Sequence, residues 1–76
     1  MAISDKKEVL KAFGQILREH RNRLGLSQDQ LSARCGVGGK DIGRIERGGR
    51  NPGVATVVDL ARGLEIEPFE LLKGLK

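Results

Sequence analysis

Residues 27–46 read SQDQLSARCGVGGKDIGRIE, and this stretch predicts two short helices joined by a tight turn. Ser27 followed by Gln30 forms the S-x-x-Q pattern of a capping box, which satisfies free backbone N–H groups at a helix start. Gly36 predicts the end of the first helix, because glycine readily adopts the left-handed conformation common there. The second helix is expected from about Gly39 to Arg47.

The second helix of this pair has an apolar face and a basic face. Ile42 and Ile45, at positions i and i+3, are expected to face the core. Lys40 and Arg44, at positions i and i+4, share an outer face. A basic helix held out by a preceding short helix is the geometry of a helix-turn-helix, whose second helix enters the major groove of DNA.

The net charge of the chain is +4, and the positive charge is concentrated around this second helix. Residues 34–50 contain five basic and two acidic side chains, whereas residues 51–76 contain three basic and four acidic ones. A local excess of positive charge favours an anionic partner such as DNA. A solvated helix face without a partner is the alternative that the charge pattern leaves open.

The composition excludes several other classes of protein. A chain of 76 residues predicts one small domain, residues 1–76, with residues 1–7 as a flexible polar arm. Cys35 is the only cysteine and His20 the only histidine, so we expect no disulfide within the chain and no metal site. We expect no enzyme and no cofactor, because neither a nucleophile–base set nor a nucleotide-binding loop occurs. No apolar run approaches the ~18 residues of a membrane span, and we expect a cytoplasmic protein without membrane contact.

Residues 25–52, GLSQDQLSARCGVGGKDIGRIERGGRNP, resemble the Cro/C1 repressor-type helix-turn-helix family, also called the xenobiotic-response-element (XRE) family. The residues that match the family pattern are Gly25, Leu26, Ser27, Gln28, Leu31, Gly36, Val37, Ile42, Ile45, Glu46, Gly48 and Pro52. The resemblance extends over about residues 13–72 and implies an all-α, compact five-helix domain with the lambda-repressor-like fold. Small stand-alone phage repressors and restriction–modification controller proteins are similar to this chain.

The resemblance implies which residues read DNA bases. Lys40, Arg44 and Asp41 would be the base-reading residues, with Arg44 suited to bidentate contact with guanine. Asp41 would either accept a hydrogen bond from cytosine or cap its own helix. We favour the cap, because Gly38 has no side chain with which to cap the helix.

The resemblance also implies contacts with DNA phosphate. The residues concerned are Gln28, Gly39, Arg47 and Arg50. Several family members place a base-reading side chain where this chain has Gly39, so that contact is absent here. Glycine inside a helix costs ~1 kcal/mol relative to alanine, and Gly43 therefore predicts a weak recognition helix.

Two further features involve the rest of the chain. The family pairs an arginine of the first helix with a glutamate late in the recognition helix, which implies a structural ion pair between Arg21 and Glu46. The first helix is expected from about Lys6 to Leu24 and the fifth from Pro68. The fourth is expected from near Val54, and its inward residues are Val54, Val57, Leu60 or Ala61, and Leu64. The fifth helix has more apolar residues than one face requires, which favours a dimer interface. Its apolar residues are Phe69, Leu71, Leu72 and Leu75.

The combined interpretation is a sequence-specific regulator of transcription that binds a near-palindromic double-stranded DNA operator as a homodimer. It would act as a repressor or autoregulator, through occupancy of the operator that blocks RNA polymerase or through contact with the polymerase. The alternative is an antitoxin-like protein-interaction module with secondary DNA binding, which the glycines of the recognition helix favour.

Overall fold

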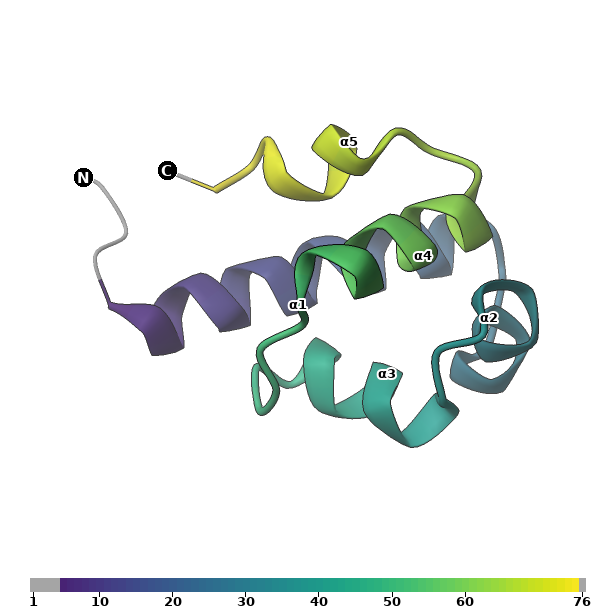
Figure 1. The fold of residues 1–76 in the computed structure, drawn as a ribbon, viewed down its shortest axis with the longest axis horizontal. Helices are drawn as coiled ribbons and strands as arrows, with labels where there is room; N and C mark the ends of the chain where they lie inside the picture. Colours follow the sequence, from purple (N-terminus) through teal and green to yellow (C-terminus); the bar gives the residue numbers. More distant parts are fainter. Residues whose placement is uncertain (1–4, 76) are drawn as a thin grey trace.

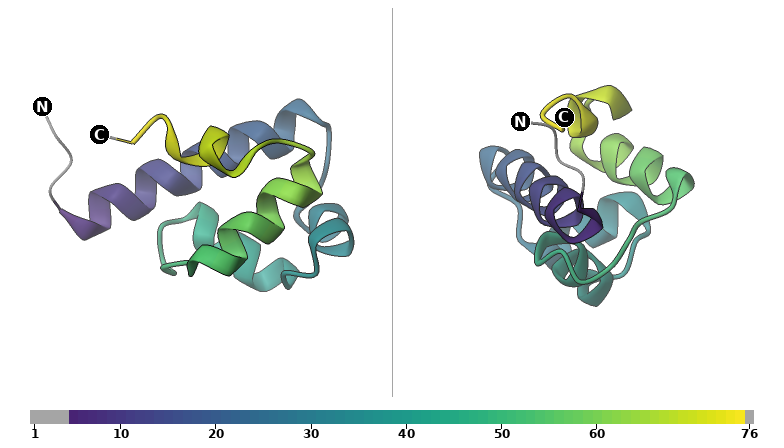
Figure 2. Two further views of the ribbon diagram at one scale, coloured as in Figure 1. Left: turned by 45° about the horizontal axis from the view of Figure 1, so that its top comes forward. Right: turned by 90° about the vertical axis from the view of Figure 1, so that its left-hand side faces the viewer.

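The structure is a computed structural model that describes residues 5–75 and consists of five helices over that range. These are α1 (Lys6–Arg23), α2 (Gln28–Cys35), α3 (Gly39–Glu46), α4 (Val54–Leu64) and α5 (Pro68–Leu72). In Figure 1, α3 and α5 lie on opposite sides of the molecule, with α1 and α4 between them. The right-hand view of Figure 2, which looks along α1, shows the same arrangement. The expected all-α, five-helix fold is confirmed.

The first helix begins at Lys6, as the sequence predicts, and so it overlaps the expected arm of residues 1–7. Asp5 is the N-cap residue of α1, and its Oδ1 accepts a hydrogen bond of 2.8 Å from the backbone N–H of Lys7. Lys6 and Lys7, expected within the arm of residues 1–7, therefore belong to the first turn of α1, because the cap starts the helix before them. Residues 1–4 of that arm lie outside the described residues.

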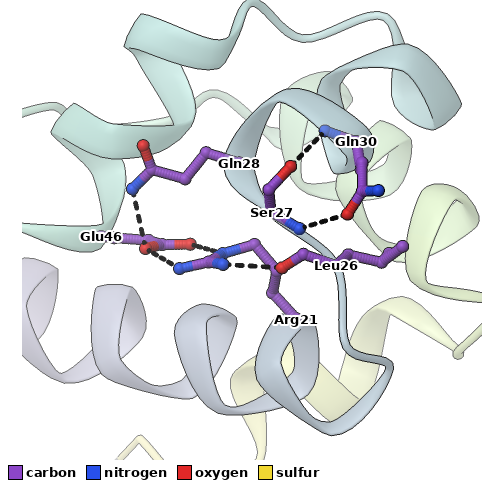
Figure 3. Close-up of polar contacts among 6 residues, drawn as sticks. All are labelled: Arg21, Leu26, Ser27, Gln28, Gln30 and Glu46. Atoms are coloured by element: carbon purple, nitrogen blue, oxygen red, sulfur yellow. Dashed lines mark hydrogen bonds and ion pairs between the residues drawn. The ribbon is translucent and has the colours of Figure 1, made fainter.

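The predicted capping box is present at the start of α2. Ser27 Oγ accepts from the backbone N–H of Gln30 at 3.0 Å, and Gln30 Oε1 accepts from the backbone N–H of Ser27 at 2.8 Å (Figure 3). Gly36 ends the helix with φ of +77°, as its position predicts. The start and the end of α2 are thus determined by residues next to them in the sequence.

Three helices end with the same pair of hydrogen bonds. After α3, the N–H of Gly49 donates to Arg44 and the N–H of Gly48 donates to Ile45, which is the Schellman arrangement. The same pattern follows α1 and α4. After α4, however, the left-handed position holds Glu65, with φ of +60°, in place of a glycine. This residue is the only non-glycine with positive φ among residues 5–75.

The core lies where α1, α2, α3 and α4 meet, with α5 closing one side. Its fully buried side chains are Leu17, Leu31, Ile42, Ile45, Leu60, Leu64 and Leu71. Ile42 and Ile45 face inward as predicted. Val54 does not: its side chain is 83% exposed, because it is the first residue of α4 and follows the exposed loop residue Gly53.

Two glycines allow helices to pack closely. A Cβ atom on Gly14 of α1 would overlap the carbonyl oxygens of Ile45 and Glu46 at the end of α3. A Cβ atom on Gly63 of α4 would lie 2.7 Å from the Cβ of Cys35 in α2. The α1–α3 and α2–α4 contacts therefore depend on the absence of these side chains.

Candidate nucleic-acid interface

Two of the three residues predicted to read bases from α3 are exposed to solvent. Ile42, Gly43 and Ile45 form the buried face of α3, whereas Lys40 and Arg44 lie on its exposed face. Arg47, directly after the helix, is exposed as well. Basic side chains on the open face of the second helix can reach a groove of DNA without any change in the core.

Arg21 and Glu46 form a buried, bidentate ion pair. Arg21 Nε donates to Glu46 Oε2 at 2.6 Å and Nη2 donates to Oε1 at 2.9 Å, while Nη1 donates to the carbonyl oxygen of Leu26 at 2.7 Å (Figure 3). The side chains of Arg21 and Glu46 are only 10% and 3% exposed. The hydrogen bond with Glu46 raises the pKa of Arg21, the carboxylate charge adds to this rise, and burial opposes it. The pair thereby connects α1, the turn before α2 and the end of α3.

Gln28, expected at DNA phosphate, is partly engaged inside the protein. Its Nε2 donates to Glu46 Oε1 at 3.2 Å, so the side chain joins the Arg21–Glu46 pair (Figure 3). Because Gln28 is the first residue of α2, its backbone N–H lies among the free N–H groups at the helix start, which favour anions. Because Nε2 of Gln28 already donates to Glu46, the backbone N–H of Gln28 is the group that the structure leaves available to a phosphate.

The cap that we favoured for Asp41 is wrong. No side chain caps α3, whose N-cap residue is Gly38. Asp41 Oδ2 instead lies 2.7 Å from Arg50 Nη1. The hydrogen bond from the N–H of Gly49 to the carbonyl of Arg44, 2.8 Å long, folds the α3–α4 loop back along α3 and brings Arg50 to the first turn.

The glycines of α3 have packing partners that the sequence pattern does not reveal. A Cβ atom on Gly43 would lie 3.2 Å from Oε1 of Gln28 and 3.3 Å from Nη1 of Arg47. A Cβ atom on Gly39 would overlap the carboxylate of Asp29 in α2. Gly43 therefore leaves room for the Gln28 side chain beside Glu46, and Gly39 leaves room for the first turn of α2. Only the small size of these residues pointed to such contacts, and periodicity alone missed them.

The apolar residues predicted for a dimer interface separate into two groups. Phe69 and Leu72 have exposed fractions of 53% and 45%, so both remain available to a partner. Leu71 is fully buried in the core and Leu75 packs partly against it. Leu71 is therefore excluded from the interface, because α5 needs this residue to attach itself to the rest of the domain.

The part of the chain that the structure describes contains no helix long and apolar enough to cross a membrane.

Comparison with known proteins identifies the family. A family model described as helix-turn-helix, HTH_3, matches residues 17–71. The control protein C.SmaI of Serratia marcescens is 38% identical over 95% of this chain and 84% of its own length. An HTH-type transcriptional regulator of Sinorhizobium fredii, y4dL, is 45% identical over 82% of this chain, and the match spans 34% of that longer protein.

A solved structure supports the same assignment. The restriction–modification controller protein C.AhdI from Aeromonas hydrophila superimposes with a TM-score of 0.80 at 45% identity, covering 82% of this chain and 94% of that one. The agreement in sequence and in fold covers the two helices of the motif and the helices that support them. The chain belongs to the HTH_3 helix-turn-helix family, of the Cro/C1 or XRE type, whose members are DNA-binding regulators of transcription rather than enzymes.

Proposed function

We propose that this protein is a sequence-specific regulator that binds a near-palindromic operator in double-stranded DNA as a homodimer. The observation that carries the proposal is the exposed basic face of α3, with Lys40 and Arg44, on a helix whose other face is fully buried. The Arg21–Glu46 pair holds the end of this helix in one orientation. A rigidly held basic helix is suited to reading the major groove.

The proposed interface separates base contacts from phosphate contacts. Lys40 and Arg44 would read base edges, with Arg44 donating both guanidinium nitrogens to a guanine. Arg47, Arg50 and the backbone N–H groups of Gln28 and Gly39 would position the domain on phosphates. Asp41 would read a base only after release from Arg50, since the two are paired in the free protein.

The proposed mechanism of regulation is occupancy of the operator. The proposed DNA-binding domain, residues 1–76, would repress transcription by blocking RNA polymerase or act on the polymerase by contact. The chain is similar to a control protein and to a restriction–modification controller protein, and the role that we propose for it is that of a repressor or autoregulator. A protein with this role works where the DNA lies, and its proposed location is the cytoplasm.

The proposed dimer uses an apolar surface that extends from α5 to the α3–α4 loop. Phe69 and Leu72 are exposed on α5. Next to Leu72 is a shallow apolar groove of about 130 Å³, which also includes Leu75, Pro52 of the loop and residues of α1. A two-fold interface here would place the loops near each other, and the two copies of α3 about one DNA turn (~34 Å) apart. A dimer doubles the number of bases read, which a single short helix needs for specificity.

The test is selection of bound duplexes from a random pool, repeated with three variants. Arg44→Ala should relax the preference at one base position and cost ~1–3 kcal/mol of binding free energy. Arg47→Ala should weaken binding to all sequences alike and flatten the salt dependence. Arg62→Ala, on the exposed side of α4, removes the same charge and should leave the selected motif unchanged. An unchanged motif in the Arg44 variant would refute the assignment.

A further inference from the structure

The ion pair between Asp41 and Arg50 lies on the proposed DNA face and is open to solvent. Asp41 is in the first turn of α3 and Arg50 is in the loop after it. Their closest atoms are 2.7 Å apart, and their side chains are 39% and 38% exposed. Ion pairs this exposed contribute little to stability. A role in holding the fold therefore does not account for this contact.

Arg50 differs from the other basic residues of α3 and the loop after it, because it has a carboxylate partner. Among the described residues, Lys40, Arg44 and Arg47 form no ion pair, so their charges are free to meet DNA. Arg50 alone of these basic residues has a carboxylate partner. Asp41 does not cap α3, so its carboxylate is directed to Arg50 rather than to the backbone of its own helix. The Asp41 carboxylate therefore accepts from the guanidinium of Arg50, which could otherwise donate to a phosphate oxygen of DNA.

We propose that Asp41 is a positioning residue that competes with DNA phosphate for Arg50. In the free protein the guanidinium of Arg50 donates to Asp41; on DNA it exchanges this carboxylate for a phosphate. The exchange leaves the Asp41 carboxylate close to a polyanion, where it retains a cation. Asp41 thereby weakens the phosphate contact of Arg50 and lowers the affinity of the domain for DNA of any sequence. This inference rests on the proposed DNA-binding function.

The test compares Asp41→Asn in the presence and in the absence of Arg50, using a short labelled duplex of mixed sequence. Asparagine keeps the shape of aspartate and removes its charge. Asp41→Asn should tighten binding about three- to tenfold and steepen the slope of log K against log salt by about one. In an Arg50→Gln background the same change should tighten binding much less, because no guanidinium is then freed, while the slope should still steepen because Asp41 no longer retains a cation. A purely structural role of Asp41 would not move the salt slope.

Glu67→Gln provides the matched control, because it makes the same change of charge at an exposed position at the start of α5, away from α3. It should alter affinity and salt slope only slightly. If Asp41→Asn tightens binding equally with and without Arg50, Asp41 acts by general repulsion and the inference is overturned while the proposed function stands. If neither the unmodified protein nor any variant binds DNA, the inference and the proposed function are both overturned.

Discussion

At the scale of single residues, the buried Arg21–Glu46 pair joins the end of α3 to α1. Every described buried side-chain nitrogen and oxygen has a hydrogen-bond partner, and the donors of Arg21 are divided between Glu46 and Leu26. A buried ion pair can be replaced by apolar residues with little loss, but removal of one partner leaves an uncompensated charge in the interior. The pair therefore determines orientation more than it increases stability.

We expect Arg21→Ala and Glu46→Ala each to lower the free energy of unfolding by ~3–5 kcal/mol, and the double variant to lose less than the sum. Denaturant unfolding of the four proteins measures this coupling, with sucrose present in all samples because a loss of this size would otherwise unfold so small a domain. The exposed pair Arg34–Glu65, with side chains 36% and 74% exposed, is the control and should show coupling near zero. Additive losses at positions 21 and 46 would show that the pair is not a unit.

The raised pKa of Arg21 also determines the pH range in which its ion pair with Glu46 contributes to the free energy of unfolding. A basic group with a raised folded-state pKa contributes fully below its unfolded-state pKa, and the contribution is lost only as pH rises through the folded-state value. For an arginine both values lie far above neutrality. The free energy of unfolding of the unmodified protein should therefore show no loss attributable to Arg21 in titrations around neutral pH.

Glu65 has the left-handed conformation that glycine occupies after α1 and α3. This conformation costs an L-residue roughly 1–2 kcal/mol, partly offset because glycine is more flexible in the unfolded chain. Glu65→Gly should raise the free energy of unfolding by ~0.5–1 kcal/mol, visible as a rise in Tm of a few degrees. Glu65→Ala also removes the contact with Arg34 but keeps the strain, and it should not be stabilising. A Tm for the glycine variant at or below that of the alanine variant would contradict this account.

At the scale of elements, α3 is short, rich in glycine and held by its neighbours. The sequence predicts weakness from Gly43, but the structure shows the space beside this residue filled by Gln28 and Arg47. The end of α3 packs against the backbone of α1 at Gly14. The stability of the recognition helix therefore comes from packing against α1 and α2 more than from its own propensity.

Replacement of each of these two glycines by alanine separates packing from propensity. Both changes raise helix propensity by up to ~1 kcal/mol. The difference between their effects on the free energy of unfolding therefore measures how much room each site has for a Cβ atom. Gly14→Ala should destabilise the domain by ~1–3 kcal/mol or more, because its Cβ meets backbone oxygens that cannot rotate away. Gly43→Ala should stabilise by ~0.5–1 kcal/mol, because its Cβ meets the ends of two flexible side chains. Thermal unfolding measures both, and equal effects would show that α1 and α3 are not in close contact.

At the scale of the whole molecule, α3 and α5 lie on opposite sides of the domain (Figures 1 and 2). The apolar groove connects α5 with the α3–α4 loop, so a dimer formed there would transmit its geometry to both copies of α3. A domain of this size gains only ~3–5 kcal/mol from one core. Burial of Phe69 and Leu72 in a dimer would add apolar contact to that small total.

Phe69→Glu and Leu72→Glu should each give folded monomers with much weaker binding to the operator. A charge at a buried apolar interface opposes association, while neither residue belongs to the core of the monomer. Sedimentation at micromolar concentration measures the state of assembly. Leu24→Glu is the matched control, since Leu24 is also 45% exposed but lies at the end of α1, and it should remain dimeric. A monomeric unmodified protein that binds a single half-site tightly would overturn the dimer, and the antitoxin-like alternative would then explain the apolar surface better.

The sequence by itself determined the features that depend on neighbouring residues. The capping box of Ser27 and Gln30, the helix end at Gly36 and the inward positions of Ile42 and Ile45 each follow from residues within one or two turns. Capping and periodicity act over that range, so a linear pattern contains the information. The family resemblance added one distant contact, Arg21 with Glu46, because both ends of that pair match a known pattern.

Only the tertiary structure decided which residues touch when they are far apart in the sequence or lie on either side of a loop. It directed Asp41 to Arg50 and the Gln28 side chain to Glu46, and it buried Leu71. For the Asp41 carboxylate, the backbone N–H groups of its own helix compete with the guanidinium of Arg50. The outcome depends on which partner the packing of helices brings within hydrogen-bond distance, and residue types along the chain do not specify that distance.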